Sequence, residues 1–295
     1  MGKRISAVES DLGSTNWGIR RRRARRMDWT PTPEQIERGL KDCDGLVRAA
    51  WAAREDFIPT SEQVERGLAD SHKVIWIKRT DWTPTPEQVE RGLADTDNDV
   101  RRTWAQRNDW TATPEQVESG LTDVDWDVRS AWVKRTDFTP TPSQVERGLE
   151  DRDSDVRRFW AKRMDWAPTQ SQIGNGLDDV APDVRRAWAE RVDWTPTSMQ
   201  VEVGLMDEDL DVRRAWAKRM DWIPTQEQIE RGLSDEMTSV RMEWAGRVDF
   251  TPTPEQIENG LKDSEDVVRI SWMRRLAAEQ EKILQDDETH FATSI

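Results

Sequence analysis

The stretch that decides the fold runs from Asp193 to Met220 and reads DWTPTSMQVEVGLMDEDLDVRRAWAKRM. Nearly the same residues recur along the chain, and successive copies start 28 residues apart except for one interval of 25. The copies open at Asp28, Asp56, Asp81, Asp109, Asp137, Asp165, Asp193, Asp221 and Asp249. A fixed period of about 20 to 50 residues is typical of stacked repeat arrays, in which each unit contacts only its neighbours. We therefore expect one elongated array of nine repeats.

The first half of each repeat predicts a short helix. In the third repeat Thr85 is followed three residues later by Gln88, and this pair recurs in all nine repeats. The spacing is that of a capping box, in which two side chains satisfy free backbone N–H groups at a helix start. Val89 and Leu93 then lie four residues apart on one helix face, and Gly92 leaves room for a close neighbour.

The second half of each repeat predicts another helix. A polar turn over residues 95–99 offers Asp97 or Asn98 as the helix cap. Val100 and Trp104 then begin an apolar stripe at helical spacing that ends at Arg107. Two helices in 28 residues leave no room for strands, so the expected fold class is all-α. The second repeat lacks three residues at its turn, and we expect a local change of twist there.

The two ends of the chain depart from the repeat. Residues 1–27 keep part of the pattern, but Arg23 takes the position of the repeat's Trp, which suits a polar cap with a single neighbour. We expect residues 1–27 to form a degenerate capping repeat, residues 28–276 the nine repeats, and residues 277–295 a helical cap with a charged tail. The opening Met-Gly-Lys-Arg-Ile-Ser also fits a myristoylation pattern, and the arginines from Arg20 to Arg26 offer a polybasic membrane signal or phosphate contacts. We favour the solvated cap.

Composition narrows the classes of function. A net charge of -14 disfavours simple binders of nucleic acid or anionic membranes, because both partners are polyanions. Charged residues make up 35% of the chain, which leaves few apolar residues for a core. Seventeen large Trp side chains supply the apolar volume that such a core needs. A single cysteine, Cys43, excludes a disulfide framework. Without a long apolar run or an evident secretory signal, we expect a cytoplasmic location.

The repeat resembles the leucine-rich repeat variant, a relative of HEAT and armadillo repeats. The likeness rests on Asp95, Asp97, Val100, Arg101, Ala105, Thr113, Pro114, Leu121 and their equivalents. It implies a right-handed superhelical solenoid of paired short helices, one of which is 3₁₀ in some relatives. The chain departs from the family in its longer unit and its Trp positions, and Cys43 alone does not provide the cysteine cluster of members that bind an iron–sulphur centre. The resemblance implies a fold and almost no function.

The most regular polar pair joins the Arg that closes the second helix to the Asp two residues later, as in Arg107 and Asp109. This Arg lies on the apolar stripe, where an unpaired charge would be costly. We therefore expect a structural ladder of Arg–Asp pairs, with Trp faces stacked on the guanidinium groups.

The first Arg of the second helix defines a row along the array. Its members are Arg48, Arg101, Arg129, Arg157, Arg185, Arg213, Arg241 and Arg269. With units roughly 10 Å apart, the row predicts either a solvated face balanced by nearby aspartates, or a cationic groove for phosphates or an acidic protein.

The turn between the two helices varies most among the repeats. Its apex changes from Gly45 to Trp126, Pro182 and Leu210. Exposed turns vary freely, but an exposed Trp126 or Leu210 would indicate a contact with a partner.

No constellation for catalysis stands out. Asp-x-Asp-x-Asp at Asp95 lacks the mid-loop Gly and the distal Glu of a calcium loop, and His72 and His290 lie far apart in sequence. We expect no enzyme activity, metal or cofactor. The favoured function is a scaffold that binds a protein through the arginine row, Trp126 and Leu210. The alternatives are nucleic-acid binding through the arginine row, and an acidic surface that imitates a polyanion.

Overall fold

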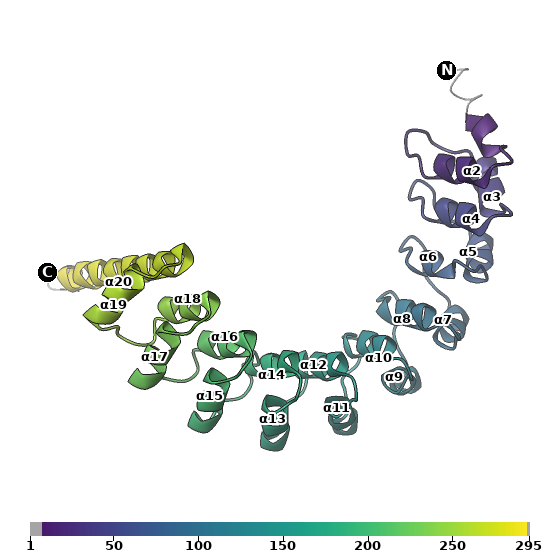
Figure 1. Ribbon diagram of the computed structural model, residues 1–295. Helices are drawn as coiled ribbons and strands as arrows, with labels where there is room; N and C mark the ends of the chain where they lie inside the picture. Colours follow the sequence, from purple (N-terminus) through teal and green to yellow (C-terminus); the bar gives the residue numbers. More distant parts are fainter. Residues whose placement is uncertain (1–7, 294–295) are drawn as a thin grey trace. The chain divides into compact units, whose positions relative to one another are not determined.

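The computed structural model describes the backbone of residues 8–293, and the side chains of residues 8–278, 280 and 281. Over this range the regular structure is entirely α-helical, and the chain divides into two compact units, residues 1–138 and 139–295. Within each unit a short helix A alternates with a helix B (Figure 1). The myristoylation pattern and the first residues of the expected N-terminal cap lie outside the described residues. Of these described helices, none is long and apolar enough to cross a membrane.

The A helices are α3 (Pro33–Leu40), α5 (Ser61–Leu68), α7 (Pro86–Leu93), α9 (Pro114–Leu121), α11 (Pro142–Leu149), α13 (Gln170–Leu177), α15 (Ser198–Leu205), α17 (Gln226–Leu233) and α19 (Pro254–Leu261). The B helices are α2 (Trp17–Ala24), α4 (Gly45–Ala52), α6 (Lys73–Ile77), α8 (Asn98–Gln106), α10 (Trp126–Val133), α12 (Ser154–Lys162), α14 (Pro182–Ala189), α16 (Leu210–Lys218), α18 (Thr238–Gly246) and α20 (Asp266–Thr293). A further helical stretch covers residues 8–12. The expected all-α helical repeat solenoid is confirmed.

Each helix A starts at the predicted capping box. The Thr85 hydroxyl accepts a hydrogen bond from the Gln88 backbone N–H at 3.3 Å, and the Gln88 amide oxygen accepts from the Thr85 N–H at 2.8 Å. All nine A helices carry both bonds. An Asp side chain accepts from the first backbone N–H groups of five described B helices, α4, α8, α10, α12 and α16, as Asp97 does for α8. Helix starts are therefore encoded locally, and both predicted caps are confirmed.

The core of each repeat is a Trp packed on a Gly. Trp104 of α8 is 1% exposed and lies directly over Gly92 of α7. A Cβ atom added to Gly92 would lie 2.0 Å from the Trp104 indole nitrogen, so no other residue fits there without displacement. Trp82 meets Trp104 edge to face, with ring centroids 6.2 Å apart. The close approach expected at Gly92 is confirmed, and it comes from the same repeat.

The second repeat has the shortest helix B among those described. The three missing residues remove the first turn of α6, which begins at Lys73. The side chain of the preceding residue, His72, makes no capping hydrogen bond to this helix. Its Trp76 and Ile77 remain buried. At the other end, α20 continues as far as Thr293, through the residues expected to form a helical cap and into the expected charged tail.

Candidate functional site

From α4 to α18, the Arg at the end of helix B forms an arginine lock, the name used here for that Arg with the Asp two residues later. The Arg219 guanidinium donates to both carboxylate oxygens of Asp221, at 2.9 and 2.5 Å. It also donates to the carbonyl oxygens of Ala189 and Arg191 in the preceding repeat and of Trp194 in its own repeat, at 2.6 to 3.0 Å. Within each unit, such locks join one repeat to the repeat before it.

The guanidinium of the lock also lies between two Trp rings. The Arg219 Cζ atom is 4.4 Å from the Trp194 ring centroid and 5.5 Å from that of Trp216. The residue is only 5% exposed, yet its charge is paired and its N–H groups are hydrogen-bonded. The predicted structural pairing of Arg and Asp, with Trp stacked on it, is confirmed.

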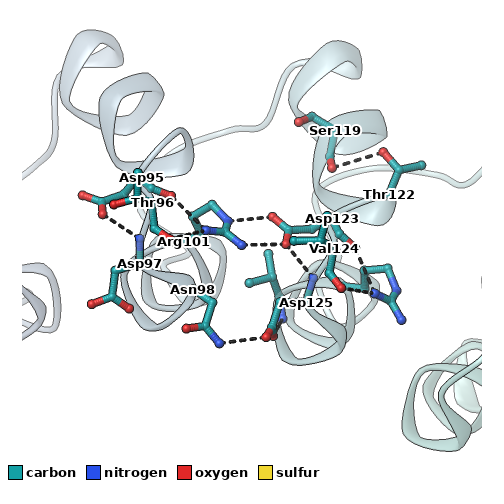
Figure 2. A network of polar contacts seen from close by, with 12 residues as sticks. Asp95, Thr96, Asp97, Asn98, Arg101, Ser119, Thr122, Asp123, Val124 and Asp125 are labelled. Atoms are coloured by element: carbon teal, nitrogen blue, oxygen red, sulfur yellow. Dashed lines mark hydrogen bonds and ion pairs between the residues drawn. The ribbon is translucent and has the colours of Figure 1, made fainter.

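The first Arg of helix B pairs with the next repeat's turn. This pairing, the turn ladder, is shown for Arg101 in Figure 2, where its guanidinium faces Asp123. The two N–H···O distances are 2.7 and 2.8 Å, and a third N–H of Arg101 donates to the Asp95 carbonyl at 2.9 Å. The other pairs are Arg20–Asp42, Arg48–Asp70, Lys73–Asp95, Arg157–Asp179, Arg185–Asp207, Arg213–Asp235 and Arg241–Asp263.

Most of the arginine row is engaged in contacts within the molecule. The Arg101 and Asp123 side chains are 13% and 12% exposed. Burial acts to raise the pKa of Asp123, but hydrogen bonds from Arg101 and the Asp125 backbone outweigh it and lower that pKa. Arg129 is buried and donates to the Asp123 carbonyl, and Arg269 to that of Asp263. Most of the row thus pairs with the turn of the next repeat, and Arg129 and Arg269 donate to backbone carbonyls of their own repeats.

The A helices carry a third connection that the sequence reading missed, named here the helix A clamp. A Glu of one helix A accepts from a Gln and an Arg of the next. Glu202 lies 2.9 Å from the Gln228 amide nitrogen and 2.7 Å from Arg231. The hydrogen bond from Gln228, with Arg231 beside it, lowers the pKa of Glu202. The equivalent clamps are Glu9 with Gln35 and Arg38, Glu37 with Gln63 and Arg66, and Glu65 with Gln88 and Arg91.

The two apolar turn residues differ in exposure. Trp126 is 40% exposed, beside Val124 at 79%. Leu210 is half-buried at the start of α16. Trp126 thus remains available to a partner, whereas Leu210 offers only part of its side chain.

A second set of exposed apolar residues was not singled out from the sequence. The residue between the Arg and the Asp of the lock is apolar in four successive repeats of the 139–295 unit. Met164, Val192, Met220 and Val248 are 53%, 78%, 50% and 66% exposed, and are called the apolar row here. The corresponding residues of the repeats before them are Glu55, Thr80, Asn108 and Thr136, while Met27, between Arg26 and Asp28, is a further exposed apolar residue at this position. The apolar residues are visible in the sequence, but the residue at this position differs between repeats, inside a motif that is otherwise constant.

Comparison with known proteins gives a likeness among solved structures. No protein-family model and no curated protein matches this chain. Among solved structures it is similar to one described as "a leucine-rich repeat variant with a novel repetitive protein structural motif". The sequences are 22% identical, the match covers 83% of this chain and 86% of that chain, and the TM-score is 0.49. The likeness concerns the fold alone.

Proposed function

We propose that this chain is a non-enzymatic helical scaffold that binds a protein partner along the apolar row. The observation that carries the proposal is the exposure of Met164, Val192, Met220 and Val248 in consecutive repeats. Single exposed apolar residues are common on protein surfaces, but aligned ones are typical of interaction sites.

The locks keep the members of the row in register. Arg191 donates to the Arg163 carbonyl at 2.6 Å, and Arg219 donates to the Arg191 carbonyl at the same distance. Met164 and Val192 directly follow those two carbonyl-bearing residues, so the row follows a backbone path fixed by hydrogen bonds. Such a preformed surface loses little conformational entropy on binding.

The arginine row, which the sequence offered as the contact surface, gives less support. Binding of phosphates would need guanidinium groups that are free to leave their carboxylate partners, and the turn-ladder pairs are largely buried and bidentate. An acidic polyanion mimic would expose the turn aspartates as free carboxylates, but the turn-ladder arginines already bind these aspartates. Trp126 stays in the proposal as an additional apolar contact in the other unit.

Affinity capture tests this function. The tagged chain is incubated with lysate from its source, with and without nuclease, beside a variant carrying Met164→Thr, Val192→Thr, Met220→Thr and Val248→Thr. Thr occupies this position in two other repeats, so the variant is expected to fold. Ile58→Thr, at an exposed apolar residue of the other unit, is the matched control.

We expect a protein that survives nuclease, is retained by the control, and is lost from the fourfold variant. Retention by the fourfold variant, or loss of all retained material after nuclease, would contradict the proposal.

A further inference from the structure

The clamp between α17 and α19 lacks its arginine. Asn259 stands where α17 has Arg231 and α7 has Arg91. The Gln256 amide nitrogen, which a complete clamp would join to Glu230, is buried without a hydrogen-bond partner. Glu230 instead accepts from Gln226 of its own helix at 3.0 Å. This clamp is therefore open, with a buried donor left unsatisfied.

Other repeats show that the arginine and the Gln–Glu bond occur together. Among the described residues, the clamps on Glu37, Glu65 and Glu202 have both contacts. Where Ser119 or Asn175 replaces the arginine, the Gln side chain keeps only its capping bonds. A guanidinium at this place thus accompanies the Gln–Glu hydrogen bond between successive A helices.

The open clamp is also a cleft. It has a volume of about 820 Å³, against about 230 Å³ at the complete clamp between α5 and α7. The two share nine repeat positions, and Leu233, Val268 and Trp272 form the apolar part of the larger cleft. Its described lining includes the carboxylates Glu230, Glu255 and Asp263 and no lysine or arginine.

We propose that this cleft binds an arginine side chain of a partner protein. The guanidinium would occupy the place that Arg91 and Arg231 fill in the complete clamps, against Glu230. Glu230 would then accept from both the ligand and the Gln256 amide, as Glu202 accepts from Gln228 with Arg231 beside it in a complete clamp. The inference deepens the proposed function, because it rests on the partner being a protein and gives one anchor residue of that partner.

The geometry of the complete clamps favours arginine over lysine. In the clamp on Glu65, Arg91 reaches one carboxylate oxygen at 2.8 Å while Gln88 holds the other at 2.6 Å. A planar guanidinium places its donors in a fixed fork and is less strongly hydrated than an ammonium group. Asp263 is already held by Arg241 at 2.8 Å, so Glu230 is the acceptor that the ligand would complete.

The test uses the full-length chain and the peptide acetyl-Gly-Gly-Arg-Gly-Gly-amide. Its lysine and citrulline analogues vary the charge and shape of the side chain. Binding is followed by NMR through the chemical shift of the Gln256 side-chain amide. We expect a saturable shift with the arginine peptide, at least threefold weaker binding of the lysine peptide, and no saturable shift with citrulline.

Two variants and a control make the test specific. Asn259→Arg supplies the missing guanidinium from the chain itself, and Glu230→Gln removes the acceptor charge without changing its shape. Both are expected to abolish the arginine-dependent shift. Asn175→Arg, the same substitution at the equivalent position of α13, is expected to leave it unchanged.

An equal shift with citrulline, an unchanged shift in Asn259→Arg or Glu230→Gln, or no binding of the arginine peptide would overturn the inference. The fourfold apolar-row variant is expected to bind the peptide as the wild type does. The peptide assay therefore tests arginine binding in the cleft separately from partner binding by the apolar row.

Discussion

Two glycines of α13 predict opposite effects of the same substitution. A Cβ atom at Gly176 would lie 2.0 Å from the Trp188 indole nitrogen, whereas one at Gly174 would meet nothing within 4 Å. Ordinary contact begins near 3.4 Å, so Gly176→Ala demands a shift of about 1.4 Å, the difference between the two distances. Trp188 is 1% exposed and has little room for that shift.

The magnitudes follow from packing and helix propensity. Overpacking of a well-filled core costs about 1–3 kcal/mol, and a clash this close belongs at the upper end. Ala in place of Gly recovers up to about 1 kcal/mol in a helix. We therefore expect Gly176→Ala to destabilise the chain by about 2 kcal/mol and Gly174→Ala to stabilise it by about 0.5–1 kcal/mol.

Urea denaturation followed by tryptophan fluorescence measures both effects on the same helix. The midpoint is expected to fall for Gly176→Ala and to rise or stay level for Gly174→Ala. Equal midpoints for the two variants would refute the account of the Trp–Gly core.

Three further predictions concern the polar connections. Arg219→Met breaks a buried lock and is expected to lower the free energy of unfolding, measured by urea denaturation, by about 3–5 kcal/mol. Lys218→Met, at an exposed neighbour, is expected to change this free energy little. Similar losses in the two variants would contradict the structural role of the lock. Hydrogen bonds from Lys41 and Gln63 lower the pKa of Glu37 to about 2. The stability that ionised Glu37 adds to the folded chain is therefore fully present above its unfolded pKa of about 4, and it is lost as the pH falls through about 2. Thermal unfolding between pH 6 and 2 checks this, and an unfolding temperature that rises on acidification would contradict it. Thr253→Ala removes a capping box and is expected to cost about 1 kcal/mol, while Thr251→Ala, an exposed residue two positions earlier, serves as the control; equal unfolding temperatures would count against the cap.

Local rules account for most of what the sequence predicted about the fold. The capping box, Asp97 before α8, and the Trp stripe each depend on residues within one repeat. The lock was also predictable, because an Arg on an apolar stripe needs a partner and an Asp lies two residues away. Contacts of this kind require no knowledge of how repeats stack.

Contacts between repeats account for what was missed. Arg101 reaches an Asp 22 residues ahead, and Glu202 is held by residues of the next helix A. Spacing alone does not show which positions face each other across a stacking interface. Lys73 illustrates this, since it takes the ladder position of an Arg only because of the shortened turn before it. The apolar row was missed for the opposite reason, because it varies within a conspicuous motif.

The most direct test of the central claim is the affinity of the captured protein for the wild type and for the variant with Thr at positions 164, 192, 220 and 248. Surface-immobilised chain and purified partner give both dissociation constants at one salt concentration. We expect the fourfold variant to bind at least tenfold more weakly while its unfolding temperature stays within a few degrees of the wild type. Equal dissociation constants would show that the apolar row is not the contact surface.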